Sequence, residues 1–298
     1  MTPAARMAAA LVALSLAAWI GAARAQPLRA PPATQAAMRE AAKAQVSEAL
    51  TLYDARRLIR LPDGSFERPQ GASEADARRA RELLLSAAYA GSAEARDYAG
   101  RMAQAGAGGP RDLPRARKLY EDAATRAARW RLAGMLERGE GGPNDSVSAR
   151  GLYKLASTQG QLDARYDFAR MARRGQGGKP DPAAALKALT SMSAVAHADA
   201  AAELADMLDK GEGGKRDPKA AAEQHLRALE SASRFYAPPP VLARWSAISA
   251  QTRAEIGKLL RARGLADAPL DGAAPPPGWD KRYLAARKGE TPPVHNAR

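Results

Sequence analysis

The sequence predicts an all-α protein in which antiparallel helix pairs stack in a solenoid, and three observations support this. The chain is rich in alanine and only 5% of its residues are aromatic, a composition that favours helices because alanine loses no side-chain entropy there. A glycine-rich motif recurs at intervals of 33, 36 and 36 residues. The residues around each motif also repeat, at spacings that lie on one face of a helix.

Residues 1–25 have the features of a secretory signal peptide. Arg6 supplies a positive charge near the start, residues 7–20 form an apolar stretch without charge, and small residues stand at the −3 and −1 positions of a cleavage site after Ala25. The uncharged run is shorter than the roughly 20 residues that a membrane-spanning helix needs, which argues against an uncleaved anchor. We therefore expect cleavage between Ala25 and Gln26, a periplasmic or secreted location, and no transmembrane segment after cleavage.

Composition narrows the function classes. The chain has no cysteine, which excludes disulfides, thiolate nucleophiles, zinc–thiolate sites and iron–sulfur clusters, and it has only three histidines. It contains neither a Gly-x-Ser-x-Gly elbow nor a His-Glu-x-x-His pair. His197 and His225 are interpreted as surface or packing residues, and Asp206 and Asp209 as solvated residues on a helix surface. We therefore predict no catalytic residue, no cofactor and no metal site, and a protein that is not an enzyme.

The formal net charge of +14 is typical of proteins that bind an anionic partner, and an Arg- and Ala-rich composition can equally reflect the base composition of a genome. Nucleic acid, anionic lipid and acidic polymers all suit a basic domain. An exported protein seldom meets nucleic acid, whereas it does meet lipid phosphates, acidic polysaccharide and peptidoglycan. We therefore expect no nucleic-acid partner.

Residues 26–69 are predicted to form a lead and a capping helix. The segment 26–37 contains several Pro and Ala residues and is expected to be a flexible lead. From Ala37 to Leu61 apolar side chains recur at helical spacing, and a Pro-Asp-Gly turn follows. Terminal units of a solenoid are usually atypical because they close the end of the stack.

Four copies of one motif organise the middle of the chain. Each has Gly at its first, third and fourth positions, Asp at the seventh and Ala at the eleventh. Met stands four residues before the first Gly, and Ala eleven residues before it. The first glycines are Gly106, Gly139, Gly175 and Gly211, the aspartates are Asp112, Asp145, Asp181 and Asp217, and the methionines are Met102, Met135, Met171 and Met207.

These columns describe two antiparallel helices joined by a tight loop. Ala, an apolar residue and Met, at −11, −7 and −4 from the first Gly, occupy one face of a first helix. The Gly ends this helix in the left-handed conformation, and the Asp begins the second helix as an N-cap. One such pair cannot bury its apolar face alone, so stacking of successive pairs is expected.

The pattern A-x3-L-x2-M-x3-G-x-G-G-x2-D-x3-A resembles the Sel-one-like repeat, the short α/α relative of the tetratricopeptide repeat. The resemblance covers residues 92–233, and a degenerate unit over 70–91 extends the predicted repeats to 70–233. The family usually has Gly-x-Gly-Val, and a Trp-Tyr pair that is reduced here to Leu119-Tyr120 and Leu152-Tyr153. The resemblance implies an α/α superhelical solenoid of about four to five 36-residue helix-pair repeats with helical caps. It implies that the protein binds partners, and it implies no reaction.

Residues 234–298 are predicted to contain a proline-rich break and a C-terminal helical region. After three prolines that end the last repeat, residues 241–264 have a helical pattern. One interpretation is a helical cap over the last repeat. The other is a separate binding module, because the run from Thr252 to Gly272 resembles a peptidoglycan-binding module, although the Gly-Pro-x-Thr and aromatic-Gln of that module do not clearly follow.

The first helices of the repeats are expected to line a concave face that binds the partner. Trp, Tyr and Arg are favoured at interfaces because they bury much area and make directional contacts. On the side of these helices away from the core, the candidate partner-binding residues are Arg101, Trp130, Arg131, Arg138, Tyr166, Arg170 and Arg174.

We therefore predict a non-enzymatic periplasmic scaffold or adaptor that mediates protein–protein interaction in an envelope or exopolysaccharide-related assembly. The alternative is an envelope protein that binds peptidoglycan or an acidic polysaccharide through its basic face and C-terminal region. Salt dependence separates the two, because screening weakens the binding of a polyanion more steeply than a packed protein interface.

Overall fold

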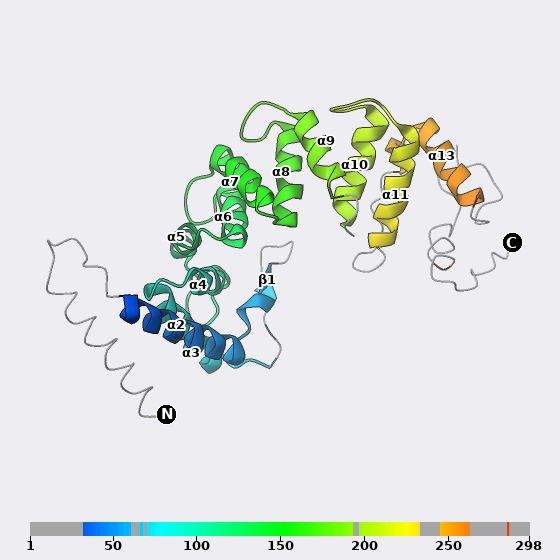
Figure 1. Cartoon of the computed structure of the whole chain (residues 1–298). Coiled ribbons are helices and arrows are strands. Elements are labelled where there is room, and N and C mark those ends of the chain that lie inside the picture. Colours follow the sequence, from blue (N-terminus) through cyan, green and yellow to red (C-terminus); the bar gives the residue numbers. More distant parts are fainter. Residues whose placement is uncertain are drawn as a thin grey trace. The chain divides into compact units, whose positions relative to one another are not determined.

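The computed structural model (Figure 1) describes residues 32–60, 66, 67, 69, 71–192, 197–232, 245–262 and 285. The chain divides into two compact units, Met1–Asn144 and Asp145–Arg298, and each is described by itself. The expected signal peptide and the first part of the expected lead lie outside the described residues, as do the three prolines after the last repeat.

The structure confirms the all-α fold. Within the described residues, eleven α-helices account for nearly all regular structure, and none of them is both long and apolar enough to cross a membrane. The first unit contains α2 (Pro32–Leu52), η1 (Ala55–Arg57), the antiparallel strands β1 (Ile59–Arg60) and β2 (Phe66–Glu67), α3 (Glu74–Tyr89), α4 (Ala93–Ala105), α5 (Leu113–Ala123) and α6 (Arg126–Arg138). The second unit contains α7 (Ser146–Thr158), α8 (Leu162–Arg174), α9 (Pro182–Thr190), α10 (Ala198–Lys210), α11 (Pro218–Ala232), η2 (Trp245–Ala247) and α13 (Ala250–Arg261).

The two strands form one short ladder, in which Ile59 pairs with Glu67 and Arg60 with Phe66.

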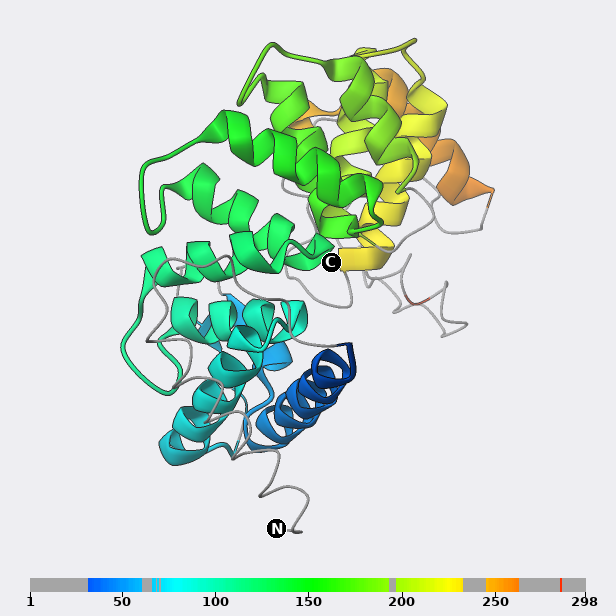
Figure 2. The same ribbon diagram turned by 60° about the vertical axis from the view of Figure 1, so that its left-hand side comes forward.

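The helices pack in sequence order within each unit. In the first unit α2 lies against α3, and the series continues through α4, α5 and α6. In the second unit α7 lies against α8, and the series continues to α11. Figure 1 shows α10 and α11 side by side, and Figure 2 shows the same packing from another direction. Within each unit, each helix therefore contacts its neighbours in sequence, as in a solenoid.

Glycine and aspartate set the helix ends as the repeat columns predict. The first glycine of each motif has a φ between +67° and +74° and is the C-cap of a first helix. Each aspartate accepts a hydrogen bond, at 2.9–3.0 Å, from the backbone N–H of the third residue after it. Such an N-cap contributes about 1 kcal/mol to stability.

The glycine at the third position of each motif is required by a close approach of two backbones. A Cβ atom at this position would lie 2.1–2.5 Å from a carbonyl oxygen of the preceding second helix, which is closer than any side chain tolerates. The pairs are Gly108 with Ala77, Gly141 with Leu113, Gly177 with Ser146, and Gly213 with Pro182. The loop of one repeat therefore rests directly on the first turn of the second helix before it.

The Met and Ala columns form the core. Met102, Met135, Met171 and Met207 have no exposed surface, at 0% each. Burial of each of these side chains contributes roughly 1.5–3 kcal/mol. The alanines are buried as well, at 0–2%, and they allow the helices to approach closely: Ala95, Ala128, Ala164 and Ala200 on the first helices, and Ala116, Ala149, Ala185 and Ala221 on the second.

The helix expected over Ala37–Leu61 differs in its bounds. It is α2, which begins earlier, at Pro32, and ends at Leu52. Proline is tolerated in a first turn because its missing N–H would have no partner there. After α2, the side chain of Asp54 accepts a hydrogen bond from the N–H of Arg56 and begins η1, so a separate short turn replaces the last part of the expected helix.

At the other end, α13 packs against α11 (Figure 2). Leu226 and Leu229 of α11 form a buried cluster with Trp245, Ile256 and Leu260. This packing is what the cap interpretation expects. The Gly-x5-Leu-Asp-Gly part of the alternative interpretation, Gly264 to Gly272, lies outside the described residues.

Candidate partner-binding surface

Arg101 of α4 is held by hydrogen bonds within the first unit. Its Nη2 donates to the backbone carbonyl oxygens of Arg56 and Leu58, at 3.1 and 3.3 Å. Burial lowers the pKa of the Arg101 guanidinium, and the nearby Arg131 lowers it further. Arg101 therefore fixes the segment after α2 against α4.

Arg131 of α6 pairs with Asp97 of the preceding first helix. Its Nη1 lies 2.9 and 3.1 Å from the two carboxylate oxygens, and the side chains are only 17% and 10% exposed. The guanidinium also lies over the ring of Trp130, 5.6 Å from its centroid. Burial raises the pKa of Asp97, although Arg131 and Arg101 act in the opposite direction. The pair joins two successive repeats and leaves little of Arg131 for a partner.

Arg138 ends a polar chain that reaches the core of the first unit. Its Nε donates to Glu140 Oε1 at 2.6 Å, and Glu140 Oε2 accepts from Gln104 Nε2 at 3.0 Å. The Oε1 of Gln104 accepts a hydrogen bond from the buried hydroxyl of Tyr120 at 3.0 Å, and burial raises the pKa of Tyr120. Arg138 is still 39% exposed, so a partner can reach it.

The three candidate residues on α8 differ in exposure. The partly buried ring of Tyr166 lies 4.9 Å from that of His197, and burial raises the pKa of Tyr166 to about 12. Arg170 is 18% exposed and contacts Asp167 on its own helix. Arg174 is exposed, and its side chain makes no hydrogen bond or ion pair with any described residue.

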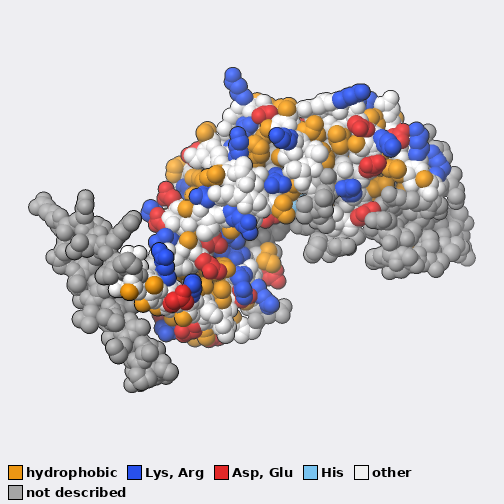
Figure 3. Space-filling view, in the orientation of Figure 1, with side chains coloured by type: hydrophobic (Ala, Val, Ile, Leu, Met, Phe, Trp, Pro, Cys, Tyr) orange, Lys and Arg blue, Asp and Glu red, His pale blue; other side chains and the backbone are white. Residues whose placement is uncertain are grey.

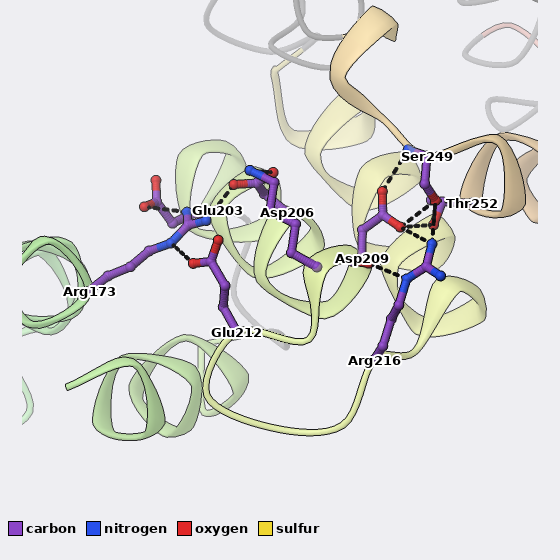
Figure 4. Close-up of polar contacts among 9 residues, drawn as sticks. Arg173, Glu203, Asp206, Asp209, Glu212, Arg216, Ser249 and Thr252 are labelled. Carbon is purple, nitrogen blue, oxygen red and sulfur yellow. Dashed lines mark hydrogen bonds and ion pairs between the residues drawn. The ribbon is translucent and has the colours of Figure 1, made fainter. Parts of the chain in front are cut away.

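The sequence pattern does not single out Arg173. In the structure Arg173 makes an ion-pair cluster (Figure 4), whereas its neighbour Arg174 makes no ion pair with any described residue. Its guanidinium lies 2.9 Å from Glu203, 2.5 Å from Asp206 and 2.6 Å from Glu212. Burial alone would lower the pKa of Arg173, but the hydrogen bonds to these carboxylates raise it. The composition of α10 could have indicated this cluster. The helix has four acidic residues and one basic residue, so basic side chains from a neighbouring helix are expected to pair with it.

Asp209 is buried, so the interpretation of the Asp206 and Asp209 pair as solvated is wrong. The side chain of Asp209 is 6% exposed. Its carboxylate accepts hydrogen bonds from the N–H and Oγ of Ser249, at 2.7 and 2.5 Å, from Oγ1 of Thr252 at 2.7 Å, and from Arg216 (Figure 4). Burial would raise the pKa of Asp209, but these hydrogen bonds lower it. Asp209 thus attaches the start of α13 to the last repeat.

In three of the four motifs, the residue two positions before the first glycine links its helix to the next element. Gln104 bonds to Glu140 of the next repeat, and Arg173 bonds to the carboxylates of the next first helix and loop. In the last repeat Asp209 bonds to the start of α13. The last repeat therefore bonds to α13 at the position where the earlier repeats bond to the repeat that follows them.

The pairing leaves no uniformly basic area in view. Figure 3 shows Lys and Arg side chains interspersed with Asp and Glu over the visible face. Among the seven candidate residues, Arg138 and Arg174 are the exposed ones. Within the part of the chain that the structure describes, no group of three or more His, Asp or Glu side chains is arranged to hold a metal ion.

Comparison with known families identifies the repeat. The Sel1 repeat model matches residues 66–92, 93–127, 126–161, 162–187 and 198–228, which together make up about half of the chain. The chain belongs to the Sel1 repeat family. The first of these five Sel1 repeats contains α3, the helix of the degenerate unit that the sequence indicates before residue 92.

Two solved structures share the Sel1 repeat fold with this chain. One is a Sel1 repeat protein from Oxalobacter formigenes, with 20% identity and a TM-score of 0.56 over 87% of this chain and 90% of that protein. The other is c5321, a protective antigen of uropathogenic Escherichia coli with an SLR fold, with 19% identity and a TM-score of 0.55 over 86% of this chain. The chain spans 46% of the length of that antigen. No curated protein matches the chain.

Proposed function

We propose that this Sel1 repeat protein is an exported, non-enzymatic scaffold that binds protein partners in an envelope or exopolysaccharide-related assembly. Family membership carries the proposal, because Sel1 repeat solenoids are typically protein-interaction scaffolds and are generally non-catalytic. The features of residues 1–25 support export, with cleavage after Ala25 and a periplasmic or secreted location.

The distribution of contacts supports a scaffold whose binding surface is separate from its stabilising ion pairs. The pairs Arg131–Asp97 and Arg173–Glu203 join successive first helices and are mostly buried. At the ends of the repeat series, α2 covers α3 and α13 covers α11. Arg174 is exposed outside these pairs, and Arg138 is exposed although it pairs with Glu140, so a partner can reach both side chains without breaking the pairs that join successive first helices.

The test is affinity capture from an envelope extract with residues 26–298, at moderate and high salt. We expect a stoichiometric protein partner at both salt concentrations, because a packed interface is only weakly screened. The charge reversals Arg138→Glu and Arg174→Glu together are expected to reduce capture without changing helicity by circular dichroism. Arg78→Glu with Lys219→Glu is the matched control, since both residues are exposed, lie on second helices and give the same change in charge.

The alternative function is direct binding of peptidoglycan or acidic polysaccharide, and it rests on the net charge of +14. Internal pairing of Arg131 and Arg173 reduces the basic surface available to a polyanion. The same experiment separates the two functions. Recovery of glycan alone, lost at high salt, would favour the alternative and contradict the protein scaffold.

A further inference from the structure

The outward strip of α7 differs from the corresponding strip on the other second helices. Residues two, six and ten positions after the repeat aspartate lie along one line of a helix, at i, i+4 and i+8. These positions are exposed in all five second helices, apart from the partly buried Ser86. The strips are Arg78, Glu82 and Ser86 in α3; Pro114, Lys118 and Asp122 in α5; Val147, Gly151 and Leu155 in α7; Ala183 and Lys187 in α9 with its C-cap Ser191; and Lys219, Glu223 and Arg227 in α11.

The α7 strip exposes large apolar side chains, whereas its counterparts expose mostly polar and charged ones and no apolar side chain larger than Pro114. In α5, for example, Lys118 pairs with Asp122 at 2.9 Å. In α7, Val147 is 70% exposed and Leu155 is 44% exposed. Of the five large apolar side chains that are exposed within the described residues, these two and Leu162 belong to α7 and the start of α8. An exposed apolar strip of this kind is typical of an interaction site.

Gly151, at the centre of the strip, is not required by packing within the second unit. A Cβ atom at Gly151 would meet no heavy atom within 4 Å. Gly100 in α4 is the opposite case, since its Cβ would lie 2.7 Å from the ring of Tyr120. Glycine inside a helix lowers stability relative to alanine, so Gly151 weakens α7 without an internal gain. Between two apolar side chains, it forms a notch through which a second backbone can approach α7 closely.

Charge indicates what approaches this notch. Arg150 and Lys154 are the only charged residues of α7, and Lys154 is exposed next to Leu155. A second copy of the chain that paired α7 with α7 would bring these cations together, and like-charge repulsion opposes that arrangement. A segment with acidic side chains beside an apolar ridge would complement both the strip and Lys154.

We propose that the strip Val147–Gly151–Leu155 is a docking surface for an amphipathic α-helix of a partner protein. The partner helix crosses α7 at Gly151, places its apolar ridge between Val147 and Leu155, and presents acidic side chains to Lys154. This inference rests on the proposed scaffold function and names the kind of partner segment that the scaffold holds.

The test is site-specific photo-crosslinking in cells that naturally produce the protein, with the full chain. A photoreactive amino acid replaces Thr158 in the last turn of α7 or, as a matched control, Thr190 in the last turn of α9. Both threonines are exposed, and each donates its hydroxyl hydrogen bond to a carbonyl of its own helix. We expect an adduct at Thr158 with a protein segment that has apolar residues at helical spacing and acidic neighbours.

Blocking variants test whether the notch itself is used. Gly151→Leu fills the notch with a good helix former and is expected to reduce the Thr158 adduct at least fivefold. Lys187→Leu makes the same side chain at the same register position of α9 and should leave the adduct unchanged. Gly151→Ala adds one methyl group and should give an intermediate loss, which keeps the test valid even if the larger side chain disturbs α7.

The outcomes are distinguishable. An adduct with a second copy of the chain, with lipid, or with a segment that lacks acidic residues would overturn the inference, as would a yield that Gly151→Leu does not change. Protein adducts at Thr190 but not at Thr158 would also overturn it while leaving the scaffold function in place. The absence of protein adducts at both sites would overturn the docking surface, whereas the scaffold function is tested separately by the affinity capture with Arg138→Glu and Arg174→Glu.

Discussion

Arg117 of α5 donates a hydrogen bond from Nη2 to the backbone carbonyl oxygen of Pro143, at 3.0 Å, and so lies beneath the glycine-rich loop that follows α6. A Cβ atom on Gly142, the fourth glycine-motif position in that loop, would lie 2.2 Å from Nη1 of Arg117. The equivalent contacts are those of Arg81 with Pro110 at 3.3 Å and of Arg150 with Lys179 at 2.9 Å. In three of the four motifs the arginine therefore occupies the space of a side chain, and in the fourth Leu186 lies against Gly214 in the same way. This explains Gly-x-Gly-Gly where the family usually has Gly-x-Gly-Val.

Gly141 and Gly142 are expected to tolerate alanine very differently. Gly141 has a φ of +77°, and its Cβ would lie 2.5 Å from the backbone oxygen of Leu113, so Gly141→Ala should lower the free energy of unfolding by about 2–4 kcal/mol. Gly142→Ala would meet only the end of the flexible Arg117 side chain, which can move, and should cost less than about 1 kcal/mol. Urea denaturation measures both. Equal losses for the two variants would contradict this account of the motif.

The Arg131–Asp97 pair is expected to stabilise the first unit. Arg131→Glu would place two carboxylates together in a mostly buried site and should lower the free energy of unfolding by about 3–5 kcal/mol. Arg174→Glu, on an exposed residue, should change it by less than about 0.5 kcal/mol. A loss of partner binding in Arg131→Glu would therefore report on folding rather than on docking.

A double-mutant cycle measures the pair itself. Arg131→Met, Asp97→Asn and the combined variant should give a coupling free energy of about 1–3 kcal/mol, because the two residues are in direct contact. A coupling near zero would show that the two side chains act independently.

Attachment of α13 should depend on pH through Asp209. Its pKa in the folded chain lies below the ordinary 3.8, so the unfolded chain takes up the proton first as the pH falls. The stabilisation by Asp209 is therefore complete above about pH 4–5 and is lost as the pH falls through the lowered folded value. We expect α13 to stay docked from about pH 5 to 8 and to separate only in more acidic solution, as the pH falls through that lowered value.

Trp245, buried in the α11–α13 cluster, provides the signal for this separation. The emission of Trp245 is obtained as the difference in fluorescence between the wild-type chain and Trp245→Phe, which removes the contribution of the other tryptophans. Asp209→Asn should weaken docking at neutral pH and remove the acid dependence. A transition near pH 6 in the wild-type chain would contradict the role of Asp209.

The sequence predicts those features of the fold that depend on interactions between residues of the same repeat. The first glycine, the aspartate and the methionine each act on residues a few positions away, so their spacing is sufficient to place a helix end, an N-cap and a core contact. The bounds of α2 are less predictable, because a terminal helix has no repeated column to align it.

Contacts between repeats are harder to predict, because they depend on how one helix pair rotates against the next. Asp97 and Arg131 are 34 residues apart, whereas the nearby repeat interval is 33, so the pair does not occupy one column. Asp209 contacts Ser249 and Thr252 beyond the proline-rich break, at separations of 40 and 43 residues. No local pattern encodes these partners, and the exposure expected of Arg131 and the solvation expected of Asp209 both depended on them.

Gly151 is expected to lower the stability of the isolated protein, because a glycine that serves only partner binding still weakens the helix that contains it. Gly151→Ala should raise the free energy of unfolding by about 1 kcal/mol, which corresponds to an increase in Tm of about 2–4 °C for a unit of this size. Gly100→Ala is the matched control, because its Cβ would lie 2.7 Å from the ring of Tyr120 and should destabilise the first unit. Thermal unfolding of the three chains measures both effects. A loss of stability in Gly151→Ala would mean that α7 requires glycine for its own packing. The presence of Gly151 would then be explained without a partner helix.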